Sequence, residues 1–192
     1  MGKFFWGFFF IYLNFNLSVN AHTLNVLPEF VGYFLLLQGL RELEEESGVF
    51  SDTRPFVVGM TVYTAILWVG ALLGVTGAGS LLSILLSLVS TAVSLYISWS
   101  IIQGVREMEE RHQADLNSAG MSLAWKVLLV ADIVSYVLTL VLPVVVAVAL
   151  VAVLVGILLL VGSLMLLVAF WRGKKCWEAV QVGTIHVKVQ WY

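Results

Sequence analysis

Apolar runs separated by short polar or charged stretches divide this 192-residue chain into six segments. A helix needs about 20 apolar residues to cross the roughly 30 Å of hydrocarbon in a bilayer. The last four segments reach this length, whereas the first two, of roughly 14 to 16 residues, fall short of it. We therefore predict six membrane helices, over residues 4–17, 28–43, 56–75, 81–103, 122–142 and 147–171.

The breaks between the runs predict three antiparallel helix pairs, which makes the fold class an all-α polytopic transmembrane bundle. The glycine-rich stretch 76–80 is typical of a tight turn. Pro143 divides the long run 122–171, because a single helix of about 75 Å would not fit one bilayer. The first pair is expected to be short or re-entrant. A cleavable signal peptide is the alternative for the first segment, but Asn14 and Asn16 interrupt it.

The basic residues predict the orientation, since Lys and Arg are retained on the cytoplasmic side during insertion. With six alternating spans, all ten fall on ends and loops of one side, so both termini are expected in the cytoplasm. The protein is expected to be a multi-pass protein of the plasma membrane. The ten are Lys3, Arg41, Arg54, Arg106, Arg111, Lys126, Arg172, Lys174, Lys175 and Lys188.

Composition agrees with a lipid environment. The chain is 60% hydrophobic and 11% charged, and its mean hydropathy is +0.99, far from soluble averages. A formal net charge of −2 argues against a nucleic-acid partner. One cysteine, Cys176, cannot form a disulfide or a Cys-based metal site within one chain. The expected partners are the lipid bilayer and either copies of the chain or another membrane subunit, and no cofactor or metal is expected.

The last segment, residues 172–192, is expected to be a cytoplasmic tail. From Ile185 to Trp191, apolar residues alternate with polar ones, which indicates a short strand. An isolated strand is unstable, so this one would pair with a partner or fray.

Asp132 is the first candidate for function, because an ionised carboxylate inside a membrane usually faces a protein interior or a wet cavity. Ser135, Tyr136 and Thr139 follow at i+3, i+4 and i+7, which places three hydroxyls on the same helix face. A structural polar clamp between helices is the alternative. Lys126 lies on a different face and is expected to anchor the helix at the cytoplasmic interface.

Small residues follow helical spacing in several spans. Hydroxyls recur at steps of three and four from Ser83 to Ser98, and this stripe predicts either close helix packing or a hydrated path shared with Asp132. Its central members are Ser87, Ser90 and Ser94. Further packing seams are expected at Gly70, Gly74, Ala149, Ala152 and Gly156.

A candidate site on the outer side consists of Glu29 and Tyr33, one helical turn apart. Glu29 follows Pro28 and suits a helix N-terminus. In a re-entrant hairpin the two side chains would instead face a cavity. The acidic stretch 42–46 is expected to be a solvated loop. Interfacial aromatic residues are predicted at Trp6, Tyr12, Trp125, Trp171 and Trp177.

No constellation of residues predicts catalysis. The three histidines, His22, His112 and His186, are scattered, and no serine or cysteine has an evident base nearby. The chain is therefore not expected to be an enzyme.

Residues 25–33, Asn-Val-Leu-Pro-Glu-Phe-Val-Gly-Tyr, followed by Gly39-Leu40, resemble a Leu-Pro-Asp-Phe-x-Gly-Tyr segment of small uncharacterised membrane proteins of Gram-positive bacteria. The chain has Glu29 where that segment usually has aspartate. The resemblance implies a bacterial plasma membrane and no particular activity.

Two functions are consistent with these patterns. The first is a nonenzymatic membrane subunit or scaffold that associates through its small-residue seams, which the sequence favours slightly. The second is a small transporter or channel for a proton, ion or small solute that uses Asp132 and the serine stripe.

Overall fold

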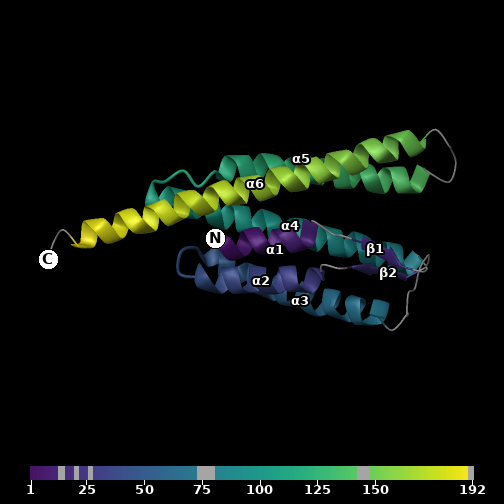
Figure 1. The fold of residues 1–192 in the computed structure, drawn as a ribbon, viewed down its shortest axis with the longest axis horizontal. Helices are drawn as coiled ribbons and strands as arrows, with labels where there is room; N and C mark the ends of the chain where they lie inside the picture. Colours follow the sequence, from purple (N-terminus) through teal and green to yellow (C-terminus); the bar gives the residue numbers. More distant parts are fainter. Residues whose placement is uncertain (13–15, 20–21, 26–27, 73–80, 142–147, 190–192) are drawn as a thin grey trace.

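Six helices and two short strands make up the computed structural model (Figure 1). It describes residues 1–12, 16–19, 22–25, 28–72, 81–141 and 148–189. The elements are α1 (Gly2–Tyr12), β1 (Asn16–Val19), β2 (His22–Asn25), α2 (Glu29–Glu42), α3 (Gly48–Leu72), α4 (Leu81–His112), α5 (Ser118–Val141) and α6 (Val148–Val189). The turn expected at 76–80, Gly74 and Pro143 lie outside the described residues.

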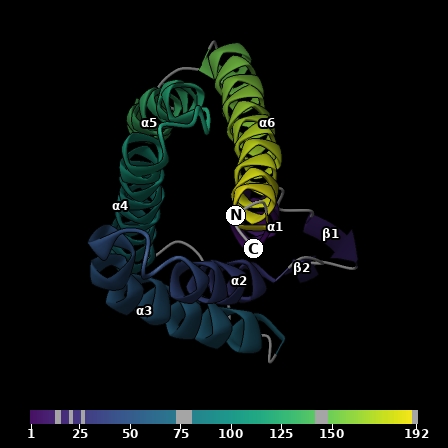
Figure 2. The same ribbon diagram turned by 90° about the vertical axis from the view of Figure 1, so that its left-hand side faces the viewer.

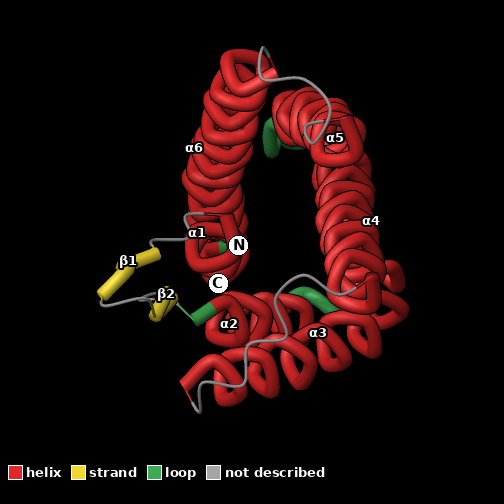
Figure 3. The backbone as a smooth tube through the Cα atoms, turned by 90° about the vertical axis from the view of Figure 1, so that its right-hand side faces the viewer, coloured by secondary structure: helices red, strands yellow, loops and turns green. Residues whose placement is uncertain are grey.

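The helices form a ring. Each helix contacts the next one along the chain, and α6 returns to contact α1 (Figure 2). The antiparallel pair β1–β2, in which Leu17 lies opposite Leu24, stands to one side of the ring (Figure 3). The sequence predicted no strand here, and a four-residue hairpin has too little apolar alternation to be recognised by pattern.

Within the part of the chain that the structure describes, three helices are long and apolar enough to cross a membrane, over Ile84–His112, Ser118–Leu138 and Val153–Val182. The third predicted span, 56–75, extends past the described end of α3. With 11 and 14 residues, α1 and α2 are shorter than a full crossing, as the sequence predicted for the first pair.

α1 and α2 run in opposite directions and cross where both have glycine. A Cβ atom on Gly7 would lie 2.9 Å from the carbonyl oxygen of Gly32, and one on Gly32 would lie 2.7 Å from that of Gly7. The Nζ of Lys3 lies 2.6 Å from a carboxylate oxygen of Glu42, which joins the start of α1 to the end of α2. Glycine therefore allows two backbones to touch at this crossing.

α1 packs aromatic side chains against its neighbouring helices. Phe4 and Phe8 are buried, and the ring centroid of Phe8 lies 4.7 Å from that of Phe170 on α6. Phe4 also packs against Phe50 at 5.8 Å, so one short helix connects α3 and α6. Such aromatic pairs are worth about 0.5–1.5 kcal/mol each beyond their buried area.

α3 begins at Gly48, eight residues before the predicted start. The hydroxyl of Ser47 accepts a hydrogen bond from the Val49 amide at 3.2 Å, which is an N-cap. Hydropathy alone does not predict this first part of the helix, because it contains Asp52, Arg54 and Pro55. Pro55 lies on an exposed face.

α5 likewise begins at Ser118 rather than Ser122. The carboxylate of Glu109 on α4 accepts hydrogen bonds from both the amide and the hydroxyl of Ser118. Asn117, with φ of 65°, makes the preceding turn in the left-handed region that asparagine tolerates. The carboxylate at the first turn complements the helix dipole, so a distant residue caps this helix.

α6 continues as a helix to Val189, so the strand expected from Ile185 is wrong for the residues that the structure describes. Extending an existing helix adds one hydrogen bond per residue fixed, whereas an isolated strand gains nothing. Residues 190–192 lie outside the described part of the chain.

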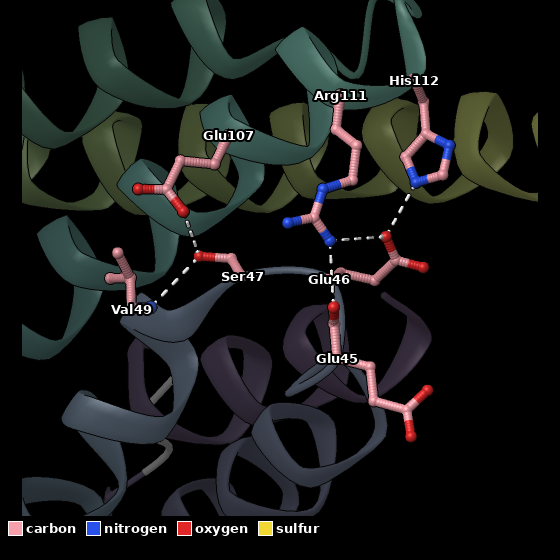
Figure 4. Close-up of polar contacts among 7 residues, drawn as sticks. All are labelled: Glu45, Glu46, Ser47, Val49, Glu107, Arg111 and His112. Carbon is pink, nitrogen blue, oxygen red and sulfur yellow. Dashed lines mark hydrogen bonds and ion pairs between the residues drawn. The ribbon is translucent and has the colours of Figure 1, made fainter.

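The connection between α2 and α3 is fastened to the end of α4 by a group of polar contacts that we call the corner clamp, made by residues 45–47, Glu107, Arg111 and His112 (Figure 4). Ser47 donates to Glu107 at 2.5 Å, Arg111 donates to the Glu45 carbonyl oxygen at 3.0 Å, and the His112 ring nitrogen lies 2.7 Å from the Glu46 carboxylate. The acidic stretch 42–46, expected to be a solvated loop, instead takes part in ion pairs.

Candidate functional site

A pocket of about 480 Å³ is lined by residues of α1, α2, α3, α4 and α5. Ten of its thirteen lining residues are on α2, α3 and α4, and Asp132 on α5 and the end of α1 complete it. We call it the acidic pocket. Its lining residues are Ile11, Tyr12, Glu29, Tyr33, Tyr63, Leu67, Leu86, Ser87, Ser90, Thr91, Ser94, Leu95 and Asp132.

Asp132 reaches this pocket from α5 and is half-buried. Among the described residues, no hydrogen bond or ion pair to its carboxylate is found. Its side chain lines the pocket and can contact a guest there. A clamp between helices, the structural alternative, stays a prediction.

The serine stripe of α4 forms one wall. Ser87, Ser90 and Ser94 line the pocket together with Thr91, as the helical spacing predicted for a path shared with Asp132. Farther along, Ser98 is buried and donates to the Ser94 carbonyl oxygen at 2.9 Å. The side chain of Ser83 lies outside the described residues.

Tyr136 fixes this wall to α5. Its hydroxyl lies 2.8 Å from the Thr91 hydroxyl and 3.2 Å from the Ser87 hydroxyl. Tyr136 is one turn beyond Asp132, so these bonds hold the carboxylate-bearing face of α5 against the stripe. Ser135 is half-buried and does not line the pocket, and the side chain of Thr139 is outside the described part of the chain.

Glu29 and Tyr33 form the wall contributed by α2. The sequence placed them on one face with a cavity as one alternative, and both line the acidic pocket. Glu29 is in the first turn of α2. The positive end of the helix dipole lies there and favours a carboxylate. The pocket thus has two carboxylates, from α2 and α5, that lie 103 positions apart in the sequence.

Three tyrosines, Tyr12, Tyr33 and Tyr63, also line the pocket. Tyr12, which was expected in an interfacial belt, has its hydroxyl 3.0 Å from that of Ser98 on α4. The last residue of α1 therefore points toward α4. No sequence pattern singled out Tyr63, whose position depends on how α3 packs.

The charge balance of the pocket is negative. It is lined by two acidic side chains and by no lysine or arginine among its described residues. Hydroxyl oxygens and tyrosine rings surround these acids, and both can contact a cation. No group of three metal-ligating side chains was found among the described residues.

The predicted small-residue seams make no close contact within the chain at Gly156, and three of their five members lie outside what the structure describes. Gly156 on α6 is exposed, and a Cβ atom there would meet nothing within 4 Å. Gly70 is half-buried on α3, and the side chains of Ala149 and Ala152 are not described. Close backbone contact occurs instead at Gly7 and Gly32, which the sequence analysis did not single out.

Comparisons with protein-family models, with curated proteins and with solved structures found no match. The likeness of residues 25–33 to a bacterial membrane-protein segment therefore stays a resemblance.

Proposed function

We propose that this chain is a small transporter or channel for cations, with the acidic pocket as its binding site. The observation that carries the proposal is the meeting of Glu29 and Asp132 in one pocket that has no basic lining residue. The sequence slightly favoured a structural subunit because it contained no second intramembrane charge beside Asp132. The place of Glu29 in the pocket supplies one.

The physical reason is electrostatic. In a low-dielectric medium a carboxylate is costly unless a positive charge or a proton accompanies it. A pocket with two acids therefore attracts a small cation and disfavours an anion. Release requires binding to be moderate, which hydroxyl and tyrosine oxygens provide in place of a closed metal cage.

In this proposal the chain crosses the membrane with both ends in the cytoplasm, and it is not an enzyme. The ten basic residues support this orientation, since alternating spans place all of them on one side. The short pair α1–α2 acts as a re-entrant hairpin that carries Glu29 into the bundle. The resemblance of residues 25–33 supports a bacterial plasma membrane.

Flux measurements in proteoliposomes test the proposal. We expect uptake of methylammonium or of a monovalent metal ion. The uptake rate should fall by about tenfold or more in Asp132→Asn or Glu29→Gln, because each change removes a charged partner of the cation. Asp52→Asn makes the same chemical change on an exposed part of α3 and should transport normally. Unchanged cation flux in Asp132→Asn, or an equal loss in Asp52→Asn, would refute the role of the pocket.

A membrane subunit or scaffold is the second candidate, and the exposed face of α6 favours it. Gly156 lies there, where an added Cβ atom would meet nothing within 4 Å, beside the exposed side chains of Val153 and Leu160. Small residues on a lipid-facing surface let another helix approach closely. This contact would join the chain to a copy of itself or to another subunit.

A further inference from the structure

A second pocket, of about 460 Å³, lies between α4 and α5 near their connection. Its polar wall is basic, in contrast to the acidic pocket. Arg106 comes from α4 and Lys126 from α5, with Gln103, Ser118 and Ser122 beside them, and Trp99 also lines it. We propose that this basic pocket binds the phosphate headgroup of an anionic membrane phospholipid.

Few acidic side chains would compete with a phosphate for Arg106 and Lys126. Arg106 is paired with Glu110 at 3.6 Å, but both side chains are exposed, and such i,i+4 pairs are worth only about 0.3–0.5 kcal/mol. Lys126 has no ion pair among the described residues. Glu109, the other nearby acid, has its carboxylate bound to Ser118. A phosphate can therefore displace Glu110 and contact both cations.

The surroundings of the pocket favour a lipid over a soluble phosphate. Lys126 belongs to an exposed face of α5 on which Leu123, Val130, Ile133 and Val137 follow at steps of three and four residues. Each of these apolar side chains is more than half exposed, and Leu123 also lines the pocket. Acyl chains attached to a bound headgroup would lie along this stripe.

Aromatic residues place the pocket at the depth of the headgroups. The indole rings of Trp99 and Trp125 pack with centroids 4.8 Å apart, and tryptophan concentrates at membrane interfaces. Basic pockets between membrane helices at this depth match anionic headgroups. The sequence had assigned Lys126 to anchoring alone, and its place in a shared pocket with Arg106 adds a binding partner. This inference does not depend on transport through the acidic pocket.

Lipid binding to the purified full chain in detergent tests the inference. Native mass spectrometry would compare phosphatidylglycerol with phosphatidylcholine of the same acyl chains. We expect preferential retention of phosphatidylglycerol, weakened roughly fivefold by Arg106→Gln or Lys126→Gln and about 25-fold by both, because each cation near the surface contributes similarly. Lys126→Arg, which keeps the charge, should retain binding.

The matched control is Arg41→Gln, which removes an exposed cation from the last turn of α2. It should leave phosphatidylglycerol retention unchanged. Equal retention of the two lipids, or wild-type retention by the double variant, would overturn the inference. Glycerol 3-phosphate, added as a competitor, should displace the lipid poorly. Displacement at equal concentration would show a site for soluble phosphate and would overturn the assignment to a lipid.

Discussion

The crossing of α1 and α2 predicts that Gly32→Ala destabilises the protein although alanine is the better helix former. The new methyl carbon would lie 2.7 Å from the Gly7 carbonyl oxygen and 2.7 Å from a side-chain carbon of Ile11. Ordinary contact begins near 3.4 Å. α1 would therefore have to withdraw by about 0.7 Å, and it could not do so freely because Phe4 and Phe8 are buried against other helices.

The expected magnitude follows from two opposing effects. Overpacking of this kind typically costs about 1–3 kcal/mol. Replacing glycine by alanine within a helix returns up to about 1 kcal/mol. From the middle of the overpacking range, about 2 kcal/mol, a net loss of about 1–2 kcal/mol remains, which corresponds to a fall in melting temperature of roughly 2–8 °C for a chain of this size.

Thermal unfolding of the detergent-solubilised protein, followed by circular dichroism, measures the effect. Gly59→Ala on α3 is the matched control, because a Cβ atom there would meet nothing within 4 Å. That variant should be as stable as the wild type or more stable by up to about 1 kcal/mol. If both alanine variants raise the melting temperature alike, the backbones at Gly32 are not in contact and the reasoning fails.

Three further predictions concern helix contacts and association. Tyr136→Phe removes the hydroxyl shared by two α4 side chains and should lower stability by about 1 kcal/mol in thermal unfolding, whereas Tyr96→Phe on an exposed face of α4 should not. Ser118→Ala removes one hydrogen bond to Glu109 and should cost about 0.5–2 kcal/mol, with loss of helical signal at lower temperature than the wild type. Gly156→Leu should leave the melting temperature of the single chain unchanged but abolish a dimer in chemical cross-linking. A dimer that persists in this variant would argue against association through α6.

The three long apolar helices were the most predictable elements, because long apolar runs have few alternatives in a lipid environment. Helix ends were less predictable. α3 starts in a charged stretch because Ser47 caps it, and α5 starts early because Glu109 reaches it from another helix. Capping by a residue nine positions away depends on tertiary structure, which hydropathy does not record.

The candidate site was predictable only along single helices. The stripe through Ser87 and Ser94 and the polar face at Asp132 follow from the helical repeat. That Glu29 shares their pocket depends on how α2 packs inside the ring, which no local pattern encodes. The alternation from Ile185 onward led to the wrong prediction of a strand. That prediction treated the segment as separate from the preceding helix, which in the structure continues through it.

The corner clamp holds α3 and α4 together at one end, so the two helices can move apart only at the other end, where they line the acidic pocket. It joins the connection that precedes α3 to the end of α4 at Arg111, while the pocket lies farther along both helices. At a rise of 1.5 Å per residue, about 30 Å of α4 separates Arg111 from Thr91, so a tilt of about 5° about the clamp would displace Thr91 by roughly 2.6 Å. A pivot at the charged end thus turns a small rotation of α4 into a displacement of the serine-lined pocket wall that is comparable to the diameter of a water molecule.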